Sequence, residues 1–427
     1  MKRFLTFTFT IVAASLSMMS QLTLDRCLEL ADENYPLIKK YDIVAKTMDI
    51  SLSDINKGWL PKISIYGQSS IQNSVPEFPA ALTGMLDQYG QDFKGMGHAQ
   101  YRIGIDLTQN IWDGGLSKSQ RDIRRAVSAV SSASLDVQMY AMHEKVQKLF
   151  FGILLIDRQI EQMQSTVDLL SANLARMKSM ERNGMAMQSD IDMIEAQILS
   201  MRQHIVEAAH SSMSYRDMLG LYIGKSISDV KLELPSGDIP LETNPDRPEL
   251  HLFDARIGMN EARLNAVASS IMPRIGLFAQ AYYGYPGLNY FQGMKNRDAS
   301  FNTLAGIRLS WNIDSFYTQK NARNSIALDN ADTETDRDLF LFNTRLQTSS
   351  LQSAINSLRI IIEEDEKIAL LRGNVRKTAE SQLTNGVIDT TDLLAKITDE
   401  NQAQLNAHYH QIQLLQNIYQ LKHTLNR

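Results

Sequence analysis

Apolar residues recur at alternating intervals of three and four along residues 153–215, with Asn183-Gly184 at the midpoint. The positions before the midpoint are Ile153, Ile156, Ile160, Met163, Val167, Leu170, Leu174 and Met177, and those after it are Ile191, Ile194, Ile198, Met201, Ile205, Ala208, Ser212 and Tyr215. This heptad spacing predicts two helices that pack along a shared seam. Gly184 can adopt the left-handed conformation that ends a helix, and Ser189 followed by Asp190 can cap the next one. We therefore predict a long antiparallel helical hairpin.

The turn of this hairpin occurs a second time in the chain. Residues 183–190 align without a gap on residues 385–392, which pairs Asn183-Gly184 with Asn385-Gly386. Residues 34–63 align in the same way on residues 246–275. Because repeats of this kind reveal the architecture of the whole chain, we predict an internal duplication. Its two repeats cover about residues 21–224 and 246–427 of a single domain, 21–427.

The N-terminus has the pattern of a secretory signal peptide. Lys2-Arg3 form a positive region, and an apolar run follows from Phe4 to Ser15. We place the signal peptide at residues 1–20, and its removal takes two positive charges from the chain, so the net charge changes from −5 to −7. A mildly acidic chain is a poor partner for nucleic acid. Cys27 is the only cysteine, and we interpret it as a small core residue.

Four segments alternate in polarity with a period of two, at residues 62–68, 101–110, 274–283 and 301–312, which predicts β-strands. Residues 71–99 and 284–300 are predicted to be loops. Short helices are predicted at residues 22–57, broken near Pro36, and at residues 249–270. Long helices are predicted at residues 116–182, 188–221, 319–383 and from Thr391 to the C-terminus. The first of these would extend ~100 Å, so it cannot be the interior of a compact globule.

The strands have the length and the polarity of membrane-crossing strands. After the signal peptide no apolar run reaches ~18 residues, which excludes a membrane-spanning helix. Strands of ~10 residues can cross an outer membrane when tilted, and Arg102, Asp106, Gln280 and Arg308 fall on faces that would line a wet lumen. Four strands cannot close a barrel, which needs about eight. The strands must therefore close with those of other copies, two or three in all.

Several segments carry a resemblance to a known family. They are residues 22–31 (LTLDRCLELA), 60–63 (LPKI) and 104–115 (GIDLTQNIWDGG), the two Asn-Gly turns and their duplicated order. Together they resemble the outer membrane efflux protein family of TolC-like channels. The resemblance covers essentially the whole mature chain. Two departures are noted: residues 312–315 read Asn-Ile-Asp-Ser where 112–115 read Trp-Asp-Gly-Gly, and we expect no C-terminal extension to contribute to the duct.

The resemblance implies a mainly α fold with a small β part. Long hairpins would form a periplasmic α-barrel, and four strands would contribute to a twelve-stranded transmembrane β-barrel of a homotrimer. It implies a passive exit duct for small molecules or ions in the cell outer membrane, extending into the periplasm. Its partners would be outer membrane lipid, a periplasmic adaptor and an inner-membrane RND or ABC transporter, in a tripartite efflux pump or type I secretion system.

The family's hairpin tips meet the adaptor and narrow the duct. The matching positions for adaptor contact are Asn183, Gly184, Met185, Asn385, Gly386 and Val387. The alternative is that the glycines only terminate helices. Asp190, Asp389 and Asp392 are candidates for a carboxylate ring that selects cations at the aperture. The alternative is that Asp190 and Asp392 only complement the helix dipole.

No metal, cofactor or catalytic activity is expected. The methionines near the first tip could hold a soft metal, although they also fill helix seams; they are Met177, Met180, Met185, Met187 and Met193. No phosphate-binding loop, dinucleotide fingerprint or nucleophile elbow occurs. The acidic run Glu363–Glu366 is interpreted as a solvated helix face.

Two rival hypotheses are a soluble periplasmic coiled-coil adaptor and an outer-membrane hydrolase. The first is disfavoured by two hairpins and lipid-compatible strands, and the second by the lack of a polar catalytic cluster.

Overall fold

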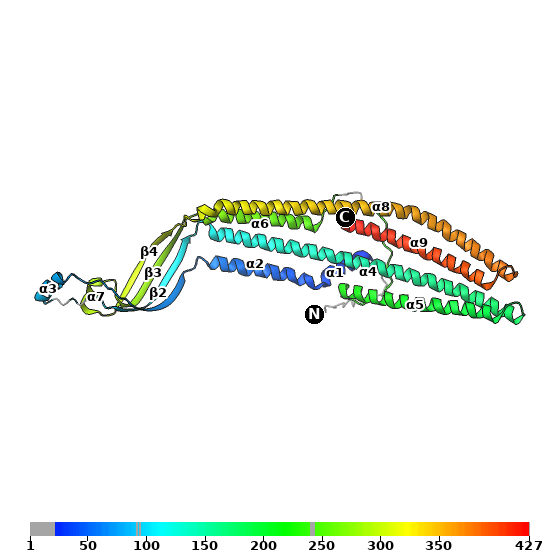
Figure 1. Ribbon diagram of the computed structural model, residues 1–427, viewed down its shortest axis with the longest axis horizontal. Coiled ribbons are helices and arrows are strands. Elements are labelled where there is room, and N and C mark those ends of the chain that lie inside the picture. Colours follow the sequence, from blue (N-terminus) through cyan, green and yellow to red (C-terminus); the bar gives the residue numbers. More distant parts are fainter. Residues whose placement is uncertain (1–21, 91–92, 94, 240–243, 427) are drawn as a thin grey trace, which may run out of the picture. The chain divides into compact units, whose positions relative to one another are not determined.

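The computed structural model describes residues 22–90, 93, 95–239 and 244–426. The predicted signal peptide therefore lies outside the described residues. The helices are α1 (Leu24–Asn34), a 3-10 turn η1 (Pro36–Ile38), α2 (Lys39–Lys57), α3 (Ala80–Gln88), α4 (Leu116–Arg182), α5 (Gln188–Ile223), α6 (Pro248–Ser270), α7 (Tyr290–Asn296), α8 (Ser315–Thr384) and α9 (Thr390–Leu425). The strands are β1 (Lys62–Ile71), β2 (Ala99–Trp112), β3 (Arg274–Tyr285) and β4 (Ser300–Ser310) (Figure 1).

The chain forms two compact units. The first comprises the described residues of 1–41, 134–250 and 338–427, and the second those of 42–133 and 251–337. The first holds α1, α5, α9 and the adjoining parts of α4 and α8, and the second holds the sheet, α2 and α6. The order helix, strand, short helix, strand, long helix, helix occurs twice along the chain, with last helices of 36 residues in both halves.

The four predicted strands and the long helices are confirmed, and α4 begins and ends at the predicted residues. Three details of the prediction were wrong. The loops 71–99 and 284–300 contain α3 and α7, which begin after Pro79 and after Asn289, whose side chain accepts a hydrogen bond from the Gln292 N–H. Gly and Pro near these short helices concealed them. Helix α8 begins at Ser315 rather than residue 319. The backbone N–H groups of Phe316 and Tyr317 already donate to the carbonyls of Ile313 and Asp314.

The strands form one antiparallel sheet in the order β1-β2-β3-β4. In its register Ile105 lies between Ile65 and Ala281, so these three side chains share one face. That face is apolar and largely exposed in the chain: Ile65 is 76% exposed and Ile307 73%. The opposite face is polar, and on it Gln280 Nε2 donates to Asp106 Oδ1 at 2.7 Å. None of the helices that the structure describes combines the length and hydropathy needed to cross a membrane.

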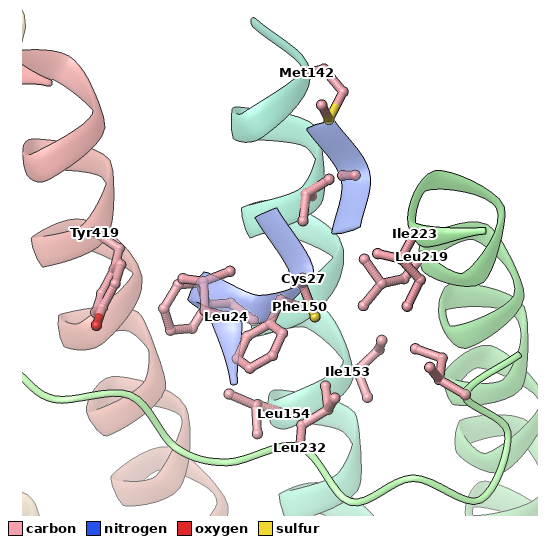
Figure 2. Close-up of a cluster of buried hydrophobic side chains, with 14 of the residues drawn as sticks. Leu24, Cys27, Met142, Phe150, Ile153, Leu154, Leu219, Ile223, Leu232 and Tyr419 are labelled. Atoms are coloured by element: carbon pink, nitrogen blue, oxygen red, sulfur yellow. The ribbon is translucent and has the colours of Figure 1, made fainter. Parts of the chain in front are cut away.

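A hydrophobic core of the first unit forms around α1. The Thr23 side chain caps α1 by accepting from the Arg26 N–H at 3.2 Å. This fixes Leu24 and Cys27 on the face that packs on Phe150 of α4 and Leu219 of α5 (Figure 2). Cys27 is 0% exposed, which confirms its prediction as a core residue. Burial raises the pKa of its thiol to about 12.

Most of the predicted heptad seam forms a second core, whereas Ile153, its first position, belongs to the core around α1. All positions of the seam are buried or half-buried except Tyr215, which is 37% exposed and lies over Gly152 of α4. The seam also receives side chains from the second hairpin, namely Ala379, Leu383, Leu393 and Ile397. The two hairpins α4–α5 and α8–α9 therefore pack side by side in the first unit (Figure 1).

The single cysteine gives a direct test of the α1 core. Because the Cys27 thiol is buried and thiolate is the reactive form, the folded chain should react with a disulfide reagent at pH 8 far more slowly than the same chain in guanidinium chloride. The control is a C27S chain carrying Val387→Cys, whose tip position is 67% exposed and should react fast without denaturant. Rapid stoichiometric reaction of folded wild-type protein would contradict this packing.

Candidate functional site at the hairpin tips

The first tip ends α4 with a left-handed glycine. Gly184 has φ +72°, and its N–H donates to the Glu181 carbonyl at 2.8 Å, while the Met185 N–H reaches back to Met180 at 2.9 Å. The Asn183 side chain donates to the Ser179 carbonyl at 2.8 Å. These bonds satisfy carbonyls that the helix end leaves without partners. Helix termination by Gly184 is confirmed.

The second tip repeats this geometry. Gly386 has φ +70°, the Val387 N–H donates to the Gln382 carbonyl at 2.9 Å, and the Asn385 side chain donates to Ser381 at 2.9 Å. A Cβ at either glycine would meet nothing within 4 Å. Glycine is therefore required at both tips by the left-handed backbone conformation. Steric contact with other described residues does not require it.

The three candidate aspartates have different surroundings. Asp190 accepts a hydrogen bond from the Met187 N–H at 2.9 Å, so α5 begins after Met187 and the predicted Ser189 cap was wrong. Asp389 caps α9 by accepting from the Asp392 N–H at 2.8 Å. Asp392 occupies the position equivalent to Asp190, but its exposed carboxylate accepts no hydrogen bond and forms no ion pair among the described residues. Of the three, Asp392 alone has no hydrogen-bond or ion-pair partner for its carboxylate among the described residues, although its charge lies in the first turn of α9, where it complements the helix dipole.

Apolar side chains project from both tips. Met185, Met187 and Val387 are 66%, 73% and 67% exposed. The hairpins meet just behind them, where the Thr391 hydroxyl lies 3.8 Å from the Met193 sulfur. Met177, by contrast, is buried in the seam, so the predicted methionine cluster is divided between core and surface. Among the described residues no group of three His, Cys, Asp or Glu side chains could hold a metal ion.

A buried polar layer links the hairpins behind the tips. Arg376 donates to Glu400 at 2.7 Å and to Glu380 at 3.1 Å, and Asn173 of α4 donates to Glu380 at 3.2 Å. The hydrogen bond to Glu400 raises the pKa of Arg376 despite its burial. The sequence did not reveal this layer, because Asn173 is 207 residues from Glu380 in the chain and no local pattern joins them.

Two further polar contacts join helices in the same unit. The Thr166 hydroxyl donates to Asn401 at 2.7 Å, so a polar residue in the α9 seam has a partner on α4. His410 lies 2.6 Å from Asp365, which is only 9% exposed. The interpretation of 363–366 as a solvated face was therefore wrong for Asp365, which turns inward between α8 and α9.

No protein-family model matches this chain, and no curated protein matches it. Solved structures match over 94% of its length. One is the outer membrane protein VceC from Vibrio cholerae, with a TM-score of 0.68, 11% identity and 95% of that chain covered. Another is the CmeC outer membrane channel of Campylobacter jejuni, with a TM-score of 0.64, 12% identity and 85% of that chain covered. A third is the MtrE outer membrane channel of Neisseria gonorrhoeae in its open state, with a TM-score of 0.65, 16% identity and 88% of that chain covered. The chain has the fold of these channels, as the resemblance predicted.

The polar layer should be needed for hairpin stability. Arg376→Met leaves Glu400 and Glu380 buried without a cation, and we expect a loss of about 3 kcal/mol in unfolding free energy, seen as a lower midpoint in denaturant. The matched control is Arg372→Met, one turn away. Its ion pair with Asp399 at 2.8 Å is about half exposed, so its loss should cost under about 1 kcal/mol. Equal effects of the two substitutions would contradict the role of the layer.

Proposed function

We propose that this chain is an outer-membrane exit duct, which passively exports small molecules or ions that an inner-membrane pump supplies. The observation that carries the proposal is the sheet, with one exposed apolar face and one polar face. An exposed apolar sheet of this kind is unfavourable in water and favourable against lipid. The protein would lie in the cell outer membrane and extend into the periplasm, and it would not be an enzyme.

The sheet edges support closure by several copies. Within the described residues β1 pairs only with β2, and β4 only with β3. Their outer edges would leave backbone N–H and C=O groups unsatisfied in lipid, which costs several kcal/mol for each group. Pairing β1 of one copy with β4 of the next removes both edges. Three copies give the twelve-stranded barrel that the family resemblance implies.

The helices of the first unit carry matching apolar stripes. On α5, Leu199, Val206 and Met213 are spaced by seven and are 61%, 55% and 55% exposed. On α8, exposed apolar residues form a stripe of two groups, which are Leu339, Phe342 and Leu346, and then Ile360, Ile361, Ile368, Leu370, Leu371 and Val375. Neither stripe belongs to a hydrophobic core of the described residues, and the spacing of seven on α5 is the pattern of a helix seam. We propose that α5 of one copy packs on α8 of the next, which closes a periplasmic α-barrel.

The tips are the proposed contact with a periplasmic adaptor. Their exposed Met185 and Val387 side chains, held by the left-handed glycines, offer apolar anchors of the kind that interfaces use. Through the adaptor the duct would join an RND or ABC transporter in a tripartite efflux pump or type I secretion system. The two sequence repeats, about 21–224 and 246–427, would then supply two tips per copy within one domain, after removal of a signal peptide at 1–20.

The assembly can be tested at the α5 stripe. Substituting Leu199, Val206 and Met213 together by Gln should abolish the trimer in detergent extracts of outer membranes, measured by size-exclusion chromatography with light scattering. Circular dichroism should show retained helix, because these side chains lie outside the chain's own cores. The control is H204Q/S211Q, at exposed α5 positions that the helical spacing places on another side. An intact trimer of the triple variant would contradict the proposed seam.

The aperture proposal concerns Asp392 most directly. Asp392→Ala should raise the conductance of single channels in planar bilayers or shift their ion selectivity towards anions, because a ring of free carboxylates attracts cations. Its thermal unfolding should change little.

Asp389→Ala is the contrasting variant. It removes the α9 cap and should cost about 1 kcal/mol of stability. If neither Asp392→Ala nor a combined change of Asp190, Asp389 and Asp392 alters conductance or selectivity, the aperture lies elsewhere.

A further inference from the structure

The four strands carry five charged residues, and all five lie on the polar face of the sheet. They are Lys62 on β1, Arg102 and Asp106 on β2, Arg274 on β3 and Arg308 on β4. The register proves the shared face, since Lys62 lies opposite Thr108, Arg102 opposite Gly284 and Arg274 opposite Ser310. The face therefore carries four cations and one carboxylate, a strong bias towards positive charge.

Three of the cations gather where the sheet meets its helices. Lys62, Arg274 and Arg308 line one cavity of about 630 Å³. Arg274 and Arg308 are diagonal neighbours on adjacent strands, because Arg274 pairs with Ser310, and such neighbours lie about 7–8 Å apart. The cavity also has an apolar element, since the Arg308 guanidinium carbon lies 4.8 Å from the centre of the Phe278 ring.

The cations of the polar face have no ion-pair partner among the residues that the structure describes, which holds for Lys62, Arg102, Arg274 and Arg308. Arg102 instead donates to the neutral Gln68 side chain at 2.8 Å. Two carboxylates, Asp54 and Asp113, also border the cavity, so its lining carries three cations and two carboxylates, and the two carboxylates have partners other than these cations. Asp113 accepts from the Ser117 and Gly115 N–H groups at 2.8 and 3.0 Å and so caps α4, and Asp54 lies 3.8 Å from Lys57.

We infer that the polar face of the sheet makes the duct prefer anions, and that its cargo includes organic anions that combine a carboxylate, sulfonate or phosphate with an apolar body. This inference rests on the proposed exit duct, in which the polar face lines the water-filled lumen. Fixed charge on the wall of a narrow pore concentrates counterions. Guanidinium groups bind carboxylate and phosphate in a bidentate geometry, and Phe278 can contact the apolar part.

The test compares two triple variants in planar bilayers with a KCl gradient. Wild-type channels should have a chloride-to-potassium permeability ratio above one, and benzenehexacarboxylate added on the sheet side should block their current. K62Q/R274Q/R308Q should lower the permeability ratio and lose the block. K62R/R274K/R308K keeps every charge and should retain both properties, which separates charge from packing.

A third variant, Asp106→Asn, should change the permeability ratio in the opposite direction. Asp106→Asn removes the face's one carboxylate while keeping an acceptor for Gln280, and it should raise the chloride preference. Conducting wild-type channels with no chloride preference, or a glutamine variant with an unchanged permeability ratio and block, would overturn the inference. Absence of any conductance from folded, membrane-inserted wild type would instead overturn the proposed duct itself. If the glutamine triple variant does not assemble, an unchanged ratio in Asp106→Asn decides against the inference.

Discussion

The apolar seam shared by the two hairpins is the interaction on which the first unit depends. Val167, Leu170, Ile194 and Leu393 come from α4, α5 and α9 and are buried against one another. Spacing of three and four lets helices of this length stay in contact without interruption. Where polar residues enter the same seam, they find partners on the facing helix, as Thr166 does with Asn401. Burial without such partners would be costly.

Each of the two units is incomplete in its own way. The sheet has unpaired outer edges and an exposed apolar face, whereas the helices keep exposed apolar stripes on α5 and α8 beside a fully formed internal seam. A monomer in water would leave all of these surfaces uncovered. In the proposed ring of identical copies in a membrane, heterologous contacts would use both edges and both stripes of every copy. This common solution is the physical basis of the proposed duct.

The sequence predicts the repeating features of the structure well and its local details less well. The hairpins, strands and polar face follow from periods of 3.5 and two that extend over many residues, and both Asn-Gly turns have the predicted left-handed glycine. The start of α5 at residue 188 was predicted correctly, but its cap was assigned to Ser189, whereas the Asp190 carboxylate accepts a hydrogen bond from the Met187 N–H. Asp365 and the Arg376 layer depend on partners distant in sequence, which no local pattern encodes.

The central claim is that the sheet lies in a membrane with its apolar face on lipid and its polar face on water. Nitroxide scanning along β2 in a C27S background tests it most directly, with labels at successive positions from Ile103 to Thr108 in reconstituted protein. Collision with oxygen should peak at Ile103, Ile105 and Leu107, and collision with a water-soluble nickel complex should peak at the positions between them. Equal exposure of all these positions to the nickel complex would contradict the account.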